Sequence, residues 1–171
     1  MQGDREGEAV KSDEIDSPGE VALDPAIRSF GVFLAASSSL ERLLGHRIQQ
    51  ECGISHSMFD VLVVLSESPG GASMSHLAGE IALTSGGITR LVDRMTDSGL
   101  VTRGRSAEDG RVQIVAMTPK GEEVLIAAAR VHARQVQEHF FGPLAPAEAA
   151  VMMTALDRLG RHAREALAAS P

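Results

Sequence analysis

The stretch TSGGITRLVDRMTDSGLVTRGRSAEDGRVQIVAMTPKG, residues 84–121, changes its hydrophobic period halfway along, and this change decides the fold. Its first half repeats large apolar side chains at i, i+3, i+4 and i+7, the spacing of one buried helical face. These side chains are Ile88, Leu91, Val92 and Met95. The second half contains two extended runs, residues 100–104 and 112–117, around a polar tip. That pattern is typical of a β-hairpin, so a helix followed by a hairpin is predicted.

Two adjacent glycines, Gly86 and Gly87, stand in the first turn of the predicted helix. A glycine inside a helix costs about 1 kcal/mol relative to alanine. Three explanations are open. The preceding loop ends later than the pattern indicates, the helix start is crowded by the protein itself, or the helix must approach another molecule closely.

The charge of the chain is unevenly distributed. The 171 residues carry a formal net charge of −7, but residues 1–24 contain eight acidic and two basic side chains. Residues 98–120 carry four basic and two acidic side chains, a local basic patch. We expect residues 1–22, which are acidic and poor in large apolar side chains, to form a disordered arm. The rest can bury a core of one domain or slightly more.

Several classes of protein do not fit the sequence. No apolar run approaches the roughly 18 residues of a membrane span, and no signal-peptide pattern begins the chain. We therefore expect a cytoplasmic protein without a membrane partner. Cys52 is the one cysteine, which excludes an intramolecular disulfide framework. No phosphate-binding glycine loop, nucleophile elbow or pair of catalytic carboxylates is recognisable, so we expect no enzyme, no cofactor and no catalytic residue.

Further helices are predicted on both sides of the opening stretch. A long helix is expected over residues 24–51, and Ser55, Ser73 and Thr84 are positioned to cap the next three helices. Thr118 followed by Pro119 is a helix start, since proline is favoured at the first helical position. That fifth helix is expected to reach residue 141, and a sixth follows the interruption GPLAP.

The predicted fold class is mainly α with a small β-hairpin wing. Residues 55–118 are expected to form a winged helix-turn-helix, flanked by helical dimerisation regions at residues 23–54 and 119–171. The apolar stripes of these flanking helices exceed what one small winged domain covers, which favours an interface. The alternative is that they fold back on their own domain. The residues expected at the interface are Phe30, Phe33, Phe140, Phe141, Met152, Leu156 and Leu159.

Residues 75–121 resemble the signature stretch of the MarR family of bacterial transcriptional regulators. The matching positions are Leu77-Ala78, Thr89 to Arg94, Gly99 to Arg103, Asp109 to Arg111, and Met117 to Gly121, with Met117 in place of the usual leucine. The resemblance implies a homodimer that binds a pseudo-palindromic operator in double-stranded DNA. It also implies a repressor that a small-molecule effector of unknown identity and unknown binding residues releases.

The outward face of the helix over residues 84–95 is the predicted DNA-reading surface, because a recognition helix presents its N-terminal residues to base edges. Its expected DNA contacts are Ser85, Gly86, Gly87, Thr89, Arg90 and Arg94. Missing side chains allow close approach, and free N–H groups at a helix start favour phosphate. Asp93 and Asp97 are expected to lie away from phosphate or to pair with Arg90 and Arg94. The alternative is a poorly formed first turn.

The hairpin is the second predicted contact. The resemblance implies that Arg111 enters the minor groove and that Asp109 orients it, and narrow minor grooves attract arginine. Arg105 and Arg103 are expected near phosphates. The alternative is that these are ordinary solvated charges of a hairpin.

Two other functions remain open beside DNA-dependent regulation by a small molecule. A thiol- or metal-responsive regulator is one, but Cys52 lies at the far end of the first long helix, whereas the reactive cysteine of the peroxide sensors lies near its start. In the zinc-sensing branch of the family a pair of metal ligands stands where this chain has Phe59 and Asp60. The chain does not match that pair, so we expect no metal site. The other is a winged helix that serves only as a dimerisation or protein-interaction module.

Overall fold

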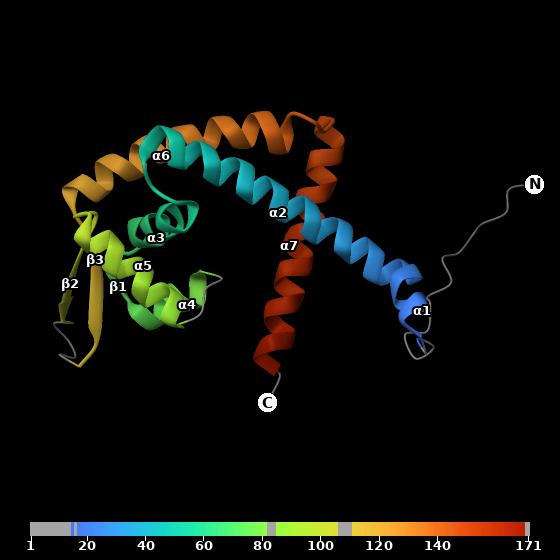
Figure 1. Ribbon diagram of the computed structural model, residues 1–171, viewed down its shortest axis with the longest axis horizontal. Helices are drawn as coiled ribbons and strands as arrows, with labels where there is room; N and C mark the ends of the chain where they lie inside the picture. The colour runs from blue at the N-terminus through green and yellow to red at the C-terminus, as the bar shows by residue number, and fades with distance from the viewer. Residues whose placement is uncertain (1–14, 16, 82–84, 106–110, 170–171) are drawn as a thin grey trace, which may run out of the picture. The chain divides into compact units, whose positions relative to one another are not determined.

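A computed structural model of the chain describes residues 15, 17–81, 85–105 and 111–169, and it consists mainly of helices with one small antiparallel sheet (Figure 1). The chain divides into two compact units, residues 1–42 and 43–171. None of the described helices is both long enough and apolar enough to cross a membrane.

The N-terminal segment contains a short helix that the sequence did not predict. Helix α1 (Pro18–Leu23) begins at a capping box, in which the side chains of Ser17 and Glu20 accept each other's backbone N–H. The predicted disorder of residues 1–22 is therefore wrong for the part that α1 occupies, while residues 1–14 and 16 lie outside the described residues. Helix α1 buries no residue, so local capping rather than a core holds it.

Helix α2 (Pro25–Cys52) is the long helix predicted over residues 24–51. It begins one residue later because Asp24 is its cap, with the Asp24 carboxylate accepting the Ile27 N–H at 2.8 Å. Leu44 and Ile48 are its buried residues, so its C-terminal half supplies the part of the helix that joins the core.

The winged core begins with three helices, α3 (His56–Ser66), α4 (Met74–Glu80) and α5 (Ser85–Asp97). Ser55 and Ser73 cap the first two, as predicted, and Thr84 lies outside the described residues. The predicted inward face of α5 is buried completely, with Ile88, Leu91, Val92 and Met95 each at most 2% exposed. This face packs into the main hydrophobic cluster, which confirms the helical period.

The sheet has one strand more than the predicted hairpin. Strands β2 (Val101–Arg105) and β3 (Gln113–Met117) pair antiparallel, each displaced by one residue from the prediction at its start. Strand β1 (Ala72–Ser73) adds to the other side of β3, which gives the order β1-β3-β2. Its pairing partner Val115 is fully buried, so β3 lies over the core.

Three helical elements complete the chain: α6 (Pro119–Val136), a π-helical turn η2 (Gln137–Phe141) and α7 (Pro146–Ala169). The predicted start at Thr118 and Pro119 is confirmed, since Thr118 caps α6. Helical structure reaches residue 141 as predicted, but its last turn is wider than an α-helix. Helix α7 buries no residue of its own.

The end of α5 is fixed by a Schellman motif. Gly99 has a φ of +72°, a left-handed conformation that favours glycine. The Leu100 N–H donates to the Met95 carbonyl and the Gly99 N–H to the Thr96 carbonyl, both at 2.9 Å. Leu100 and Met95 are both buried, so an apolar contact accompanies the turn.

The start of α6 is bonded to this same turn. The Thr118 hydroxyl donates to the Gly99 carbonyl at 2.7 Å, and Lys120 Nζ donates to the Ser98 carbonyl at 2.7 Å. A β-carbon at Gly121 would overlap the Leu100 carbonyl, so only glycine permits this approach. The first turn of α6 and the last turn of α5 are thus held together.

Candidate nucleic-acid interface

The two glycines belong to the first turn of helix α5, which begins at Ser85. The explanation that a loop ends later is therefore wrong. A β-carbon built at Gly86 would meet only Arg90 Nη2, at 3.9 Å, so the protein does not crowd this position. Crowding by the protein is thus excluded at Gly86 and stays open at Gly87, and close approach by another molecule stays a prediction.

One face of α5 is exposed from Gly86 to Asp97. Gly86, Thr89, Arg90, Asp93 and Arg94 are exposed, opposite the buried apolar face. The Arg90 Nε–H donates to the Gly86 carbonyl at 3.2 Å, so this side chain folds back along the first turn. The predicted residues Gly86, Thr89, Arg90 and Arg94 therefore share this face, and Gly87 beside them is half-buried. The side chain of Ser85 lies outside the described part.

Arg103 on β2 pairs with an acidic residue of α5, a contact that the sequence did not predict. Its Nη2 forms an ion pair with Asp93 Oδ1 at 2.7 Å and also donates to the Thr89 carbonyl at 3.3 Å. Asp93 therefore pairs with Arg103 rather than with Arg90 or Arg94, and the alternative expectation, that Asp93 lies away from phosphate, stays a prediction. Because alternate residues of a strand share a face, Arg103 lies on the side of buried Val101 and faces α5. The pair fixes β2 against α5, and a phosphate contact by Arg103 stays a prediction.

The tip of the wing lies partly outside the described residues. Arg105 ends β2, and Arg111 precedes β3, and both side chains are exposed. Asp109 belongs to residues 106–110, which the structure does not describe. The minor-groove role of Arg111 and the orienting role of Asp109 therefore remain predictions.

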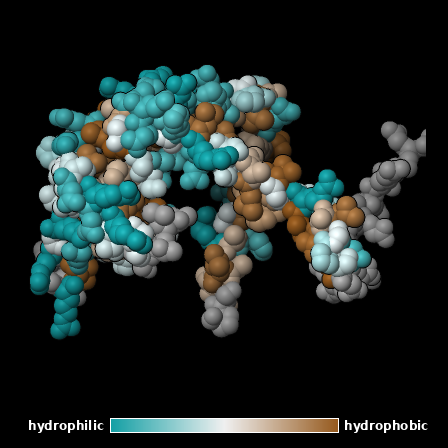
Figure 2. All heavy atoms as spheres, viewed as in Figure 1, coloured by the Kyte–Doolittle hydropathy of each residue, from teal (hydrophilic) through white to brown (hydrophobic). Residues whose placement is uncertain are grey.

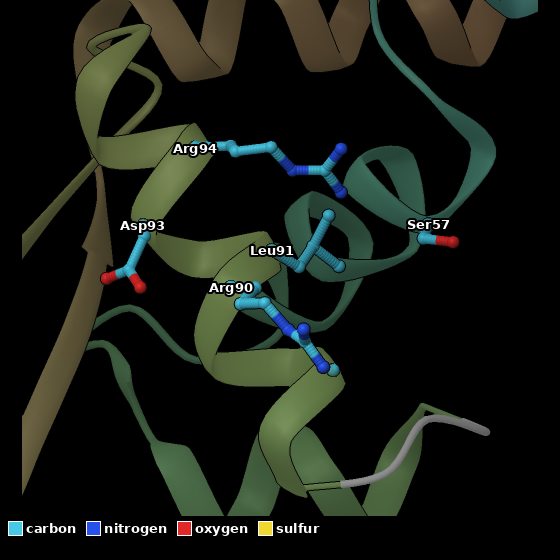
Figure 3. A pocket seen from close by; sticks show the side chains of 6 residues that line it. Ser57, Arg90, Leu91, Asp93 and Arg94 are labelled. Atoms are coloured by element: carbon cyan, nitrogen blue, oxygen red, sulfur yellow. The ribbon is translucent and has the colours of Figure 1, made fainter.

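A groove of about 630 Å³ runs along α5 beside the start of α3 (Figure 3). Figure 3 shows the Arg90 and Arg94 side chains extending toward the side on which Ser57 lies, whereas Asp93 points away from it. Ser57 was missed from the sequence, because nothing local marks it as a neighbour of α5. The groove is lined by Ser57, Gly87, Arg90, Leu91, Asp93 and Arg94.

Helices α3 and α6 bring together two histidines that are far apart in the sequence. The rings of His56 and His132 lie 5.5 Å apart, and Phe59 lies 4.9 Å from His132. His56 Nε2 lies 3.8 Å from Asp60 Oδ1, and both Nδ1 atoms are buried without a hydrogen-bond partner among the described residues. Burial lowers the pKa of His132 and the neighbouring His56 lowers it further, while Asp60 opposes them.

The thiol of Cys52 lies at the end of α2 and is partly buried. Burial raises its pKa, and the adjacent Glu51 raises it further against the opposing charge of Arg134. A raised pKa reduces the thiolate fraction, and the thiolate is the reactive form. Within the described part of the chain, no three or more His, Cys, Asp or Glu side chains gather where they could hold a metal ion.

The residues predicted for dimerisation are incompletely covered in the single chain (Figure 2). Phe30 and Phe33 on α2 are 61% and 48% exposed, and Leu159 on α7 is 61% exposed. The remaining predicted residues are half-buried; they are Phe140, Phe141, Met152 and Leu156. These helices present apolar faces that the described contacts leave open to solvent.

Comparison with known proteins identifies this architecture. A family model described as the MarR family matches residues 53–112. The chain is 30% identical over 113 residues to a protein described as the transcriptional regulator for the hcr operon of Thauera aromatica, covering 66% of this chain and 67% of that protein. It is 27% identical over 150 residues to the HTH-type transcriptional regulator YkoM of Bacillus subtilis, covering 86% and 94%.

Among solved structures, the MarR family regulator Sco3205 from Streptomyces coelicolor, in complex with DNA, superposes with a TM-score of 0.72 at 28% identity. It covers 84% of this chain and 90% of Sco3205. The matched residues include the exposed face of α5 and the strand β2 that is bonded to it. With its winged helix-turn-helix, its recognition helix and these relatives, the chain is a member of the MarR family of DNA-binding transcriptional regulators.

Proposed function

We propose that the protein is a homodimer that binds a pseudo-palindromic operator and represses transcription until a small molecule releases it. The observation that carries this proposal is the exposed face of α5, where Gly86 leaves the backbone open and Thr89 and Arg90 stand beside it. We infer that the protein acts by binding, without an enzymatic activity, as do the regulators to which it is similar.

The docking we propose places the first turns of α5 in the major groove. A recognition helix contacts base edges through its N-terminal residues, and threonine and arginine can both hydrogen-bond there. The wing then lies over the adjacent backbone with Arg105 and Arg111 exposed on it. The Asp93–Arg103 ion pair supports this docking, since it holds the strand of the wing against the recognition helix.

The apolar faces of α2 and α7 support a homodimer. Large side chains such as Phe30 and Leu159 are more than half exposed in the single chain, and exposed apolar patches mark interaction sites. Two winged domains in one dimer would meet half-sites about one helical turn of DNA apart, roughly 34–36 Å.

We infer repression and its release by a small molecule from the family alone, and the effector is not identified. An effector that binds only the DNA-free conformation shifts the population of dimers away from DNA by its difference in affinity between the two states. This part of the proposal is tested by adding candidate small molecules to a preformed complex and measuring the fraction of DNA released.

The experiment that tests the central proposal is a gel-shift titration with DNA from upstream of the protein's own gene, with a shuffled duplex of equal length as the control. We expect a preference for the upstream duplex and a mass of two chains by light scattering. Equal, weak binding to both duplexes would contradict sequence-specific binding. A dimer without any DNA binding would favour the alternative, a winged helix that serves only as an interaction module.

A further inference from the structure

We propose that the groove between α3 and α5 binds one phosphate of the DNA backbone, with Arg94 and Arg90 supplying the charge and Ser57 a hydroxyl donor. The inference rests on the proposed DNA binding and deepens it. It assigns Arg94 to the backbone of DNA rather than to its bases, with Arg90 adding positive charge beside it, and it adds α3 as a contact element.

The directions of the side chains carry the first step. Arg90 and Arg94 are four residues apart, so they lie on one face of α5, one turn above the other. Both reach toward the side of the groove where Ser57 stands at the start of α3 (Figure 3). Asp93, the one acid that lines the groove, points the other way.

The charges of the side chains that line the groove favour an anion. Asp93 forms its ion pair with Arg103, at 2.7 Å, and this pair neutralises the carboxylate. Within the described residues, the guanidinium of Arg94 forms no ion pair of its own. The groove is therefore positive, and a guanidinium beside a second donor suits the oxygens of a phosphate.

The position of Arg94 along the helix distinguishes phosphate from base. Arg94 lies nine residues after Ser85, which is about 13 Å along the helix axis. Base edges are contacted by the N-terminal residues of a recognition helix, so Arg94 lies too far along α5 for them. The phosphates that border the major groove are the groups within its reach. The N-terminal N–H groups of α3, an 11-residue helix, add to the attraction for an anion.

Loss of a phosphate contact weakens binding to any DNA sequence and lowers the salt dependence of binding, whereas loss of a base contact changes sequence preference. We therefore measure the affinity of Arg94→Gln for two DNA duplexes over a range of salt concentrations. The two duplexes are the DNA upstream of the gene and its shuffled control. We expect Arg94→Gln to weaken binding to both by the same factor and to reduce the salt slope by about 0.9 per phosphate lost. Arg94→Lys, which keeps the charge, should retain most of the slope. Ser57→Ala should weaken both complexes while changing the slope little.

The matched control is Arg158→Gln, which removes an exposed arginine from α7 and should leave the salt slope unchanged. Ethylation interference then locates the contact. The wild-type complex should be sensitive to one phosphate in each half-site at which the Arg94→Gln complex is no longer sensitive. Melting curves establish that each variant is folded.

The outcomes separate this inference from the proposed function. A wild type that binds neither duplex overturns both. A wild type that binds DNA, with an Arg94→Gln variant of equal slope and equal interference pattern, overturns the phosphate assignment alone. Loss of preference for the upstream duplex in Arg94→Gln would make Arg94 a base-reading residue, which also overturns it. A third outcome would also overturn the phosphate assignment: inorganic phosphate stabilises the wild type but not Arg94→Gln, and the two proteins bind DNA equally well. The groove would then bind a free anion rather than DNA.

Discussion

Replacing Gly86 by alanine separates the stability of α5 from its fit to DNA, because the two effects have opposite signs. In the free protein the new methyl group would meet only Arg90 Nη2, at 3.9 Å, an ordinary contact. The residue is helical, so the substitution should stabilise the fold by about 0.4–1 kcal/mol. For a chain of this length that corresponds to a rise in Tm of roughly 1–4 °C.

On DNA, the same methyl group would stand where we expect the closest approach to the bases. Overfilling a well-packed contact costs about 1–3 kcal/mol. Such a loss is roughly a 5- to 150-fold weaker affinity for each half-site that is affected. The assay is a thermal melt and an anisotropy titration on the same preparation of Gly86→Ala.

The matched control is Gly79→Ala, a second exposed helical glycine whose β-carbon would meet nothing within 4 Å. It should gain stability and keep its affinity for DNA. A Gly86→Ala protein that is more stable and binds DNA as well as the wild type would refute close approach. A less stable one would mean that this turn is not helical.

Four further predictions concern other parts of the molecule. Arg111→Ala should weaken DNA binding and leave the mass of the dimer unchanged in light scattering; unchanged affinity at physiological salt would remove the wing from the interface. Residues 1–16 hold six acidic and two basic side chains. Deleting them should tighten DNA binding slightly, most at low salt, because their negative charge repels phosphate over a screening length of about 8 Å at physiological salt. A variant that no longer forms a dimer would instead make this segment structural. The pKa of His132 is lowered in the folded state, so the unfolded chain binds more protons as the pH falls. The contribution of His132 to stability should therefore be complete above about pH 6.5 and be lost below it. His132→Gln should show a smaller fall in Tm than the wild type between about pH 7.5 and pH 5.5, and an equal fall would exclude this ring as the cause. Asp93→Asn should destabilise the fold by about 1 kcal/mol, since Arg103 keeps its charge without the partner; a double-mutant cycle with Arg103→Gln that shows no coupling would contradict the ion pair.

The parts of the fold that the sequence predicted depend on neighbours in the chain. The buried face of α5 is readable because four apolar residues repeat within eight positions, and Ser55, Ser73 and Thr118 cap their helices through bonds that span three residues. Strand β1 was not predictable, because two residues are too few to show an alternating pattern. The π-helical turn at Gln137–Phe141 has the composition of an ordinary helix end.

The features of the site that were missed join residues distant in the chain. Ser57 and Arg94 line one groove from two helices, and His56 meets His132 across α3 and α6. No spacing rule reports such pairs. The Asp93–Arg103 pair is different, because side chains of β2 alternate between the two faces of the strand and this alternation predicts the direction of Arg103. Once Val101 is taken as buried, residue 103 must face the helix rather than solvent.

The bonded turn between α5 and α6 has a mechanical consequence. Thr118 and Lys120 bond the first turn of α6 to the last turn of α5, so we expect the two helices to move together. Helix α6 has 18 residues and is about 27 Å long, which makes it a lever arm with the recognition helix at one end. A tilt of about 5° at the far end, beside the π-helical turn, would displace α5 by roughly 2 Å over that length. In the proposed dimer, small changes where the helices of two chains meet would therefore alter the separation of the two DNA-reading surfaces.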